Sequence, residues 1–427
     1  MNKSDKEVTP KLRFQSFRDF PKWKIKKLEN FVEPIRRRAG TEKHLLMSVT
    51  AGVGLIPQAE KFGREIAGDA YKNYFVIQKY DFAYNKSATK QFPEGYIAML
   101  KDYDDAAVPN SIFTCFRVSN SECDPIFFDQ LFQANHHGKW LRRYIEVGGR
   151  AHGALSIDTK HLWSMPIASP SRSEQQKIAA CLSSIDHLIS AEEKKLSLLN
   201  DYKKSWMQKL FPAEGESMPA WRFPEFSQDG SWKRTVLSKV TTYVDYRGKT
   251  PRKTQKGIFL ITAKNIKMGY IDYDSSREYV PKENYYAIMS RGLPEIGDVL
   301  ITTEAPCGNI AQIDRTDVAI AQRIIKYRGI DGTINNTFLK YIFLSPVFQN
   351  ELHKKMVGGV VKGIKGSVLH KMLIAFPDNL LEQKKIADFF SGIDHLIYTQ
   401  VNKISRLRNQ KISLVQGLFP SMEEIEK

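Results

Sequence analysis

The chain has 427 residues, of which 42% are hydrophobic and 26% charged, and this ordinary globular composition excludes a largely disordered protein. Its 64 lysine and arginine residues outnumber its 47 aspartate and glutamate residues and give a formal charge of +17, so we expect an anionic partner such as nucleic acid. No apolar run approaches the roughly 18–20 residues that span a bilayer and the N-terminal residues lack the apolar stretch of a signal peptide, so we expect a cytoplasmic protein without a membrane partner.

A short lead-in segment near the N-terminus recurs in the middle of the chain. Arg13 and Trp23 of the first copy correspond to Arg222 and Trp232 of the second, at one constant offset (222 − 13 = 232 − 23 = 209). Each copy has the form Arg-Phe-x-x-Phe followed by Trp-Lys. This recurrence indicates an internal duplication.

Each lead-in segment is followed by a body, and the two bodies are dissimilar in sequence. Short β-branched and aromatic runs, such as residues 74–77 and 299–302, lie between turn-forming residues. Helical patterns follow at 125–146 in the first body and at 336–356 in the second. We therefore expect two mixed α/β domains in an α+β protein. Different bodies on a shared framework suggest two different binding specificities.

A 39-residue segment closes each half and is repeated without a gap. Residues 174–212 and 382–420 are offset by 208 (382 − 174 = 420 − 212), and 20 of the 39 aligned positions are identical. Apolar residues recur three, four and seven positions apart and each copy ends at Leu-Phe-Pro, which predicts two long helices. At about 1.5 Å per residue each is a rod of about 50 Å, whose apolar stripe favours an intramolecular antiparallel or crossed coiled coil. The alternative is two ordinary core helices in separate domains.

The repeats predict a pseudo-twofold organisation of the chain. The expected segments are an N-terminal segment (1–22), the first body (23–170), a central helix (171–212), a linker with the repeated lead-in (213–231), the second body (232–379), a C-terminal helix (380–420) and an acidic tail (421–427).

No catalytic motif is found in the sequence. A DNA amino-methyltransferase needs an Asp/Asn-Pro-Pro-aromatic loop, and the chain contains no Pro-Pro pair. Residues 248–250 resemble the end of a phosphate-binding loop, but Pro251 follows and the first glycine is missing. His136 and His137 lack partners at metal-ligand spacing, so we interpret them as surface residues or at most phosphate contacts. The four cysteines are scattered, which fits a reducing compartment. We expect no catalytic residue and no metal site.

Basic and amide side chains near glycine-rich turns are the expected DNA contacts. Lys and Arg bind phosphates, whereas Arg, Lys, Asn and Gln read base edges. The candidates in the first body are Arg36, Arg37, Arg38, Lys86, Lys90, Gln91, Arg142, Arg143, Arg150 and His152. The candidates in the second body are Arg247, Lys249, Arg252, Lys253, Lys264, Asn265, Gln322, Arg323, Lys362 and Lys365. Any single lysine is well explained as a solvated surface charge, but the whole set with its net charge favours DNA or RNA.

The doubled helix and the doubled lead-in resemble those of the specificity subunit of type I restriction–modification systems. The resemblance is carried by Glu-Gln-x-Lys-Ile-Ala, Ile-Asp-His-Leu-Ile and Leu-Phe-Pro in the helices and by the Arg-Phe-x-x-Phe and Trp-Lys lead-ins, and it covers essentially the whole chain. It implies two target recognition domains separated by two long antiparallel conserved helices. Each domain would read one half of a bipartite, asymmetric double-stranded DNA site in the major groove, and the helices would set the length of the unread spacer.

The resemblance also implies that the chemistry belongs to partner subunits. Two modification subunits would bring S-adenosylmethionine, and two restriction subunits would bring ATP-driven translocation and cleavage with Mg, so that this chain would hold no cofactor. The helices would dock the modification subunits, and the residues expected there are Ile178, Ile185, His187, Ile189, Ile386, Ile393, His395 and Ile397.

Two other functions remain alternatives. A self-contained DNA methyltransferase or nuclease would need the motifs that this sequence lacks. A coiled-coil architectural protein would bind nucleic acid without recognising a duplex sequence. Under the first interpretation, Arg252→Ala or Lys362→Ala should weaken methylation of the recognised site.

Overall fold

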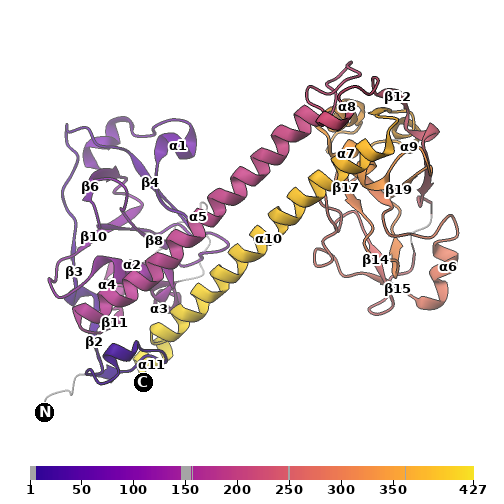
Figure 1. The fold of residues 1–427 in the computed structure, drawn as a ribbon. Helices are drawn as coiled ribbons and strands as arrows, with labels where there is room; N and C mark the ends of the chain where they lie inside the picture. The colour runs from indigo at the N-terminus through magenta and orange to yellow at the C-terminus, as the bar shows by residue number, and fades with distance from the viewer. Residues whose placement is uncertain (1–5, 146–154, 156, 249–250, 361) are drawn as a thin grey trace, which may run out of the picture. The chain divides into compact units, whose positions relative to one another are not determined.

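The computed structural model describes residues 6–145, 155, 157–248, 251–360 and 362–427. The chain divides into two compact units, Met1–Glu192 with Lys403–Lys427, and Glu193–Asn402. Each unit therefore contains one body together with part of each long helix (Figure 1). Among the residues described, no helix is both long and apolar enough to cross a membrane.

The first unit is built from small antiparallel sheets. A three-stranded sheet has the order β1 (Glu7–Val8), β2 (Trp23–Lys27), β11 (Pro166–Ser169). A four-stranded sheet has the order β3 (Val32–Pro34), β10 (Phe113–Val118), β7 (Phe82–Asn85), β8 (Tyr96–Met99). Two hairpin-like pairs are β4 (Met47–Thr50) with β5 (Gly54–Pro57) and β6 (Phe75–Gln78) with β9 (Asp105–Val108). The short helices are α1 (Gln58–Phe62), α2 (Pro125–Gln133), α3 (His136–Leu141), α4 (Thr159–Trp163) and α11 (Met422–Glu426).

The second unit repeats the paired strands and the four-stranded sheet of the first unit and adds a mixed sheet. β12 (Lys233–Val236) pairs with β20 (Leu373–Phe376), as β2 pairs with β11. A four-stranded antiparallel sheet has the order β13 (Thr241–Asp245), β19 (Ile324–Gly329), β16 (Val299–Thr303), β17 (Cys307–Gln312). A mixed sheet has the order β15 (Tyr279–Val280), β14 (Ile258–Ile261), β18 (Val318–Ile320). The short helices are α6 (Tyr285–Ile288), α7 (Asn336–Leu344), α8 (Pro346–Lys355) and α9 (Gly366–Leu369).

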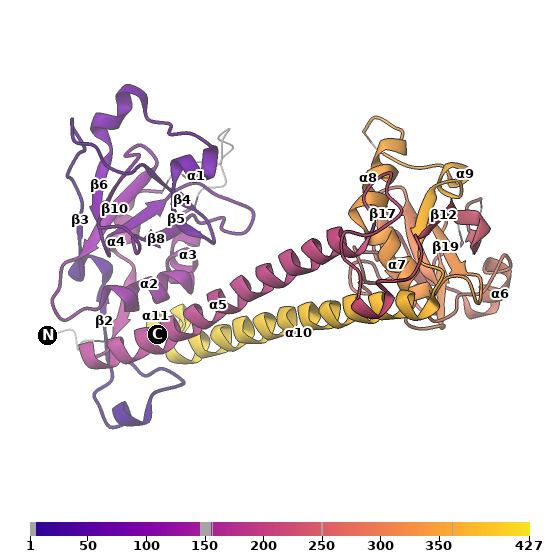
Figure 2. The ribbon, with the colours of Figure 1, turned by 45° about the horizontal axis from the view of Figure 1, so that its top comes forward.

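The two repeated segments are long helices, α5 (Arg172–Leu210) and α10 (Leu380–Leu418), of 39 residues each. In the first unit, the Lys411 amino group lies 2.6 Å from the Asp186 carboxylate, and that of Lys403 lies 2.5 Å from Glu192. Position numbers rise along one helix as they fall along the other, so the two segments are antiparallel there, as expected (Figures 1 and 2). In the second unit, Lys203 contacts Asp394, which are the counterparts of Lys411 and Asp186 (411 − 203 = 394 − 186 = 208).

Each lead-in segment is fixed to the start of a long helix by a buried ion pair. The Arg13 guanidinium makes two 2.8 Å hydrogen bonds to the Glu174 carboxylate, and Arg222 makes two of 2.7 and 2.6 Å to Glu382. The two carboxylate side chains are only 1% and 0% exposed. Two parallel N–H···O bonds to one carboxylate also fix orientation. The repeated Arg and Glu are therefore explained by one anchoring contact made twice.

The cores of the units share a second repeated junction. In the first unit, Phe127 of α2 contacts Trp23 and Phe419, with ring centroids 6.0 and 5.2 Å apart. In the second, Phe211 contacts Trp232 and Phe338, at 6.0 and 5.8 Å. Burying each such ring contributes roughly 1.5–3 kcal/mol. The lead-in tryptophan, one helix of the body and the end of a long helix therefore form the centre of both cores.

Candidate nucleic-acid interface

Two hollows on the second unit gather most of the DNA-contact residues that the sequence predicts there. The first, of about 470 Å³, is lined by four of them: Arg247, Gln322, Arg323 and Lys365. The second, of about 300 Å³, is lined by Lys253 and Lys264 and shares Gln322 and Arg323 with the first. Residues that lie more than a hundred positions apart in the sequence thus form one polar, basic surface.

Backbone hydrogen bonds at the strand ends bring these loops together. Gln322 and Arg323 directly precede β19, and the N–H of Thr303 at the end of β16 donates to the Arg323 carbonyl at 2.9 Å. The N–H of Ile364 in turn donates to the Thr303 carbonyl at 3.0 Å. The glycine-rich segment that carries Lys365 is therefore held against the same strand end as Arg323.

Gly366 allows Arg247 to approach this segment closely. A Cβ atom at position 366 would lie 2.5 Å from Nη2 of Arg247 and 3.1 Å from Oδ2 of Asp245. The Arg247 side chain donates to Asp245, with Nε 2.8 Å from Oδ2, and this hydrogen bond raises the pKa of the guanidinium. Any larger residue at 366 would displace the guanidinium. The observed position of the Arg247 side chain therefore requires glycine at 366.

Of the cations on this surface besides Arg247, two have an acidic neighbour and two form no ion pair within the described residues. Arg323 lies 3.6 Å from Glu304, and Lys253 lies 2.5 Å from Glu278. Lys264 and Lys365 are exposed and form no ion pair within the described residues. Exposed ion pairs are weak and exchange partners readily. The hollows can therefore offer positive charge to phosphate groups and amide or guanidinium donors to base edges.

The remaining candidates of the second body lie differently. Asn265 is 0% exposed, and its side-chain amide donates to the carbonyls of Asp272 and Ser276 at 2.9 and 2.8 Å. The expectation that Asn265 contacts DNA is therefore wrong for this structure, because its hydrogen-bonding groups are used to close a loop. Arg252 and Lys362 are exposed outside the two hollows. Lys249 lies outside the described residues.

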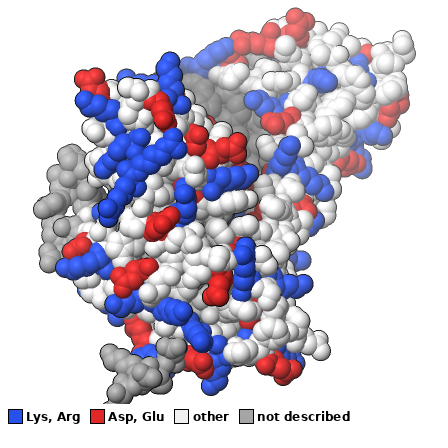
Figure 3. Space-filling model, turned by 90° about the vertical axis from the view of Figure 1, so that its left-hand side faces the viewer, with Lys and Arg blue, Asp and Glu red and all other residues white. Residues whose placement is uncertain are grey.

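The candidates of the first body have separate surroundings. Arg37 pairs with Glu42 at 2.6 Å, Arg38 donates to the Asn73 carbonyl at 2.6 Å, Arg142 to Glu94 at 2.6 Å, and Arg143 pairs with Glu426 at 2.6 Å. Arg36, Lys90 and Gln91 are exposed, Lys86 is partly buried, and Arg150 and His152 lie outside the described residues. On the face drawn in Figure 3, Lys and Arg form several patches with Asp and Glu among them.

A basic hollow of the first unit was not predicted from the sequence. It has a volume of about 450 Å³ and is lined by five cationic residues: Arg13, Lys22, Lys24, Lys26 and Arg172. Lys24 and Lys26 alternate with buried or half-buried Trp23 and Ile25 on β2, so both lysines face outward. This alternation was the signal in the sequence that could have revealed the hollow.

A family model matches most of the second half of the chain. A family model described as the type I restriction modification DNA specificity domain matches residues 246–409, a range that contains all the predicted residues that line the two hollows of the second unit. The matched domain and the relatives described below assign the chain the role of a type I restriction–modification specificity subunit.

Two curated relatives come from Methanocaldococcus jannaschii. The type I restriction enzyme MjaVIII specificity subunit is 28% identical over 295 residues, which cover 66% of this specificity subunit and 67% of the relative. The putative MjaX specificity subunit is 26% identical over 311 residues, which cover 71% and 69%. Both similarities extend well beyond a single body.

Two solved structures share the fold. The type I restriction–modification S subunit from M. genitalium superposes with a TM-score of 0.59 at 14% identity, covering 97% of this specificity subunit and 100% of that chain. A chain solved in work on complex assembly and conformational transition of the type I R-M system gives a TM-score of 0.53 at 18% identity, covering 93% and 98%. The fold therefore extends over the whole length, although the identities are low.

As a specificity subunit, the protein is a DNA sequence-recognition component and not a catalytic one.

The adjacent histidines His136 and His137 fit a structural role. His136 and His137 are 4% and 1% exposed, so the interpretation as surface residues is wrong, and burial lowers their pKa values to about 3 and about 4. Within the described ranges, no group of His, Cys, Asp and Glu side chains is arranged to hold a metal ion.

The helix residues expected to dock partners fall into three groups. Ile178, Ile386 and Ile393 are at most 5% exposed and belong to the specificity subunit's own cores, so they cannot contact a partner. Ile185, Ile189 and Ile397 are partly buried, and His187 and His395 are exposed. The neighbouring repeat pair Leu188 and Leu396 is 42% and 54% exposed. These two leucines are not predicted from the sequence, because periodicity alone does not give the direction of each side chain.

Proposed function

We propose that the specificity subunit reads a bipartite, asymmetric double-stranded DNA site, one half with each body, and that the paired hollows of the second unit form the reading surface of that body. The observation that carries this proposal is the convergence of Arg247, Gln322, Arg323 and Lys365 on one surface. Arg and Gln are the residues that make bidentate contacts to guanine and adenine edges, and lysines hold the phosphates beside them.

We propose that the first body also has a reading surface, on which the positive charges are less concentrated. Arg36, Lys90 and Gln91 offer exposed donors, and Arg37, Arg38, Lys86, Arg142 and Arg143 can follow the phosphate backbone beside them. The spacer between the two half-sites is set by the long helices. The segment boundaries at residues 22, 170, 212, 231, 379 and 420 are part of the same proposal.

Methylation and cleavage belong to partner subunits in this proposal. Two modification subunits bind S-adenosylmethionine and methylate the DNA, and two restriction subunits bring ATP and Mg for translocation and cleavage. The modification subunits dock on exposed residues of the helix pair, such as His187 and His395 with the adjacent leucines. The complex works in the cytoplasm, which suits four free cysteines.

Substitutions at Arg323, which lines both hollows, and at Lys365, which lines the first, test the DNA-reading surface. Arg323→Ala and Lys365→Ala should each weaken binding of the cognate duplex by about 1–3 kcal/mol, or roughly 5- to 150-fold. The change at Arg323 should also relax the preference at one base pair if it reads a base. Fluorescence anisotropy with the cognate duplex and with single-base-pair variants of it measures both effects.

The matched control is Arg277→Ala, which removes one exposed arginine of the same unit that pairs with Asp274 outside the hollows. Equal losses for the control and for Arg323→Ala would contradict the assignment of the surface. The cognate duplex is obtained by mapping methylated adenines in cells with and without the gene. An unchanged methylation map would contradict the proposed role itself.

A further inference from the structure

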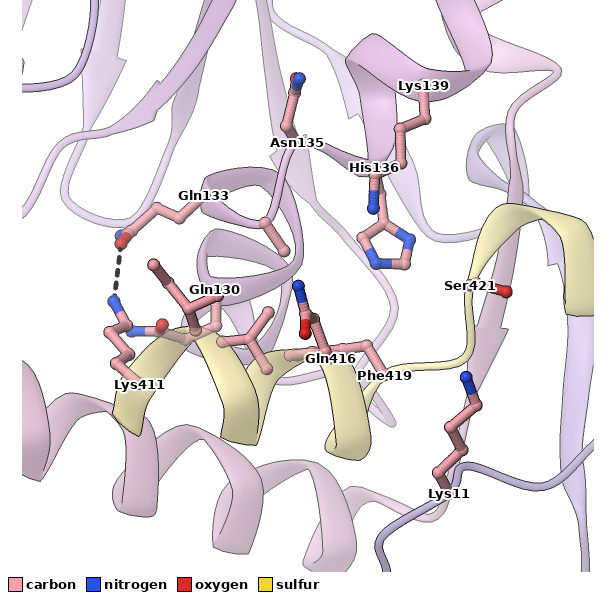
Figure 4. Close-up of a pocket in the computed structure, with 13 residues that line it drawn as sticks. Lys11, Gln130, Gln133, Asn135, His136, Lys139, Lys411, Gln416, Phe419 and Ser421 are labelled. Atoms are coloured by element: carbon pink, nitrogen blue, oxygen red, sulfur yellow. Dashed lines mark hydrogen bonds between the residues drawn. The ribbon is translucent and has the colours of Figure 1, made fainter. Parts of the chain in front are cut away.

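The first unit contains an open pocket at a corner that bulkier, buried side chains occupy in the second unit. The pocket has a volume of about 480 Å³ and lies between α2, α3 and the end of α10. Figure 4 shows Gln130 contributed by α2, His136 by α3 and Gln416 by α10. All of its lining residues belong to the first unit.

Two buried acceptor atoms of residues that line this pocket lack a partner among the described residues, Oε1 of Gln130 and Oδ1 of Asn135. Gln130 is 1% exposed, and its Nε2 donates to Oδ2 of Asp186 at 3.0 Å, which fixes the orientation of the amide. Its Oε1 is buried and accepts no hydrogen bond from any described residue. An unsatisfied buried acceptor costs roughly 1–3 kcal/mol. A ligand with an N–H donor would remove this cost.

The charge of the pocket is positive. Lys11, Lys139 and Lys411 are among the described residues that line it, and none of those residues is acidic. Lys411 is neutralised by Asp186 at 2.6 Å, and Lys11 lies 3.6 Å from Glu424. Lys139 is exposed and forms no ion pair within the described part of the chain. The pocket lining therefore offers cationic donors together with unpaired acceptors.

The equivalent corner of the second unit is filled. The backbone N–H of Asp124, the N-cap of α2, donates to Oε1 of Gln175 in one long helix. The backbone N–H of Asn335, the N-cap of α7, donates to Oε1 of Gln383 in the other, which aligns α2 and α7 at an offset of 211 (335 − 124). Tyr341 then occupies the place of Gln130 (341 − 130 = 211), and its hydroxyl donates to Asp394 at 2.8 Å. Leu344 and Met207 stand where the first unit has Gln133 and Val415 (344 − 133 = 211; 415 − 207 = 208).

We propose that this pocket binds a carboxylate-bearing segment of a modification subunit, so that the first unit makes a docking contact that the second unit cannot make. This inference rests on the proposed function, because it requires modification subunits as partners. It deepens that function by making docking on the two units unequal although the anchoring contacts of the two units are equivalent.

A polypeptide fits the pocket better than DNA does. Part of the lining is apolar, with Ile412, Val415 and Phe419. A phosphate backbone has no donor for Gln130 Oε1, whereas a peptide carries N–H groups together with carboxylates. The chain's own acidic tail is already engaged, because Glu424 caps α11 and Glu426 pairs with Arg143. Charge complementarity and the unpaired acceptor therefore both point to an acidic segment of another protein.

Two variants of the full-length specificity subunit test this site with purified modification subunit as the probe. Gln130→Tyr copies the residue of the closed corner, and Lys139→Glu reverses an exposed charge. Native mass spectrometry and sedimentation follow the two binding steps. Each variant should weaken one step on the order of tenfold and leave the other step unchanged.

The matched control is Lys43→Glu, an exposed lysine of the same unit that does not line the pocket. This control should bind the modification subunit in both steps, and the DNA, with the same affinity as the wild type. Unchanged binding in both pocket variants, or equal weakening of both steps, would overturn the inference. Failure of the wild type to bind any modification subunit would instead overturn the proposed function and this inference with it. Thermal unfolding confirms that the variants are folded.

Discussion

His136 and His137 lie at the start of α3 and are buried together with aromatic rings. The ring of His137 lies 6.0 Å from that of Phe132 and 6.1 Å from that of Tyr84, and His136 lies 5.9 Å from Phe419. Burial penalises the charged imidazolium, so both pKa values lie below the usual 6.5, at about 3 and about 4. The folded first unit therefore holds both histidines in the neutral form.

This burial predicts acid sensitivity of the first unit. Between pH 6.5 and about 4 the unfolded chain binds protons at these positions while the folded chain does not, so the free energy of unfolding falls as the pH drops, by on the order of 1 kcal/mol per pH unit for each histidine. His137→Phe keeps the ring packing and should reduce the slope. Urea unfolding at pH 7, 6 and 5 measures it, with His187→Phe at an exposed position as control. Equal slopes in the two variants would contradict the prediction.

The buried arginine–glutamate pairs are a second residue-scale feature with a measurable consequence. Arg222→Ala leaves the Glu382 carboxylate, which is 0% exposed, without its partner, and should lower the free energy of unfolding by about 3–5 kcal/mol. Lys233→Ala removes an exposed pair with Asp378 and should cost less than about 1 kcal/mol. Urea titration compares the two. Similar losses would show that the first pair does not anchor the lead-in segment.

At the scale of elements, repeated contacts explain why the long helices have kept one register. Lys411 with Asp186 and Lys203 with Asp394 are the same contact in two units, and each helix supplies one lysine and one aspartate. A deletion in one helix alone shifts all later residues along and around the axis, because four residues advance a helix by about 6 Å and turn it by about 40° beyond one full turn. Such a deletion should separate these pairs and destabilise the protein.

Matched deletions should instead shorten the spacer. Removing residues 193–196 from α5 together with 399–402 from α10 preserves both ion pairs and removes about 6 Å, which corresponds to one or two base pairs of duplex at about 3.4 Å each. Methylation mapping in cells that carry the altered subunit gives the new spacer directly. An unchanged spacer in a folded, active variant would exclude the proposed ruler role.

The whole molecule consists of two bodies on equivalent anchors, and this arrangement predicts modular exchange. Replacing residues 23–170 by the body of another specificity subunit leaves Arg13 and Glu174 in place. The donor body must supply counterparts of Trp23 and Phe127 to pack on Phe419 and a capped helix like α2 to meet Gln175. We expect the hybrid to keep one half of the recognised site and to change the other. Methylation mapping decides this, and a change in both halves would contradict independent recognition by the two bodies.

The duplication was visible in the sequence at every scale, because both copies of a repeat must satisfy the same local geometry. The two 39-residue helices and the lead-in segments follow from apolar periodicity and a constant offset, which depend on neighbours in the chain. The periodicity left an antiparallel or a crossed pairing of the helices open. The basic composition likewise pointed to an anionic partner without knowledge of the fold.

Only the tertiary structure decided which polar residues face solvent and which close the interior. Asn265 and Lys264 are neighbours in the sequence, yet one is fully buried in a loop and the other lines a hollow. Gln130 and Tyr341 stand at equivalent places, and the difference between an open and a closed pocket depends on how each fills the space beside an aspartate. Such outcomes are set by contacts between residues far apart in the chain, and residue type and spacing carry no record of those contacts.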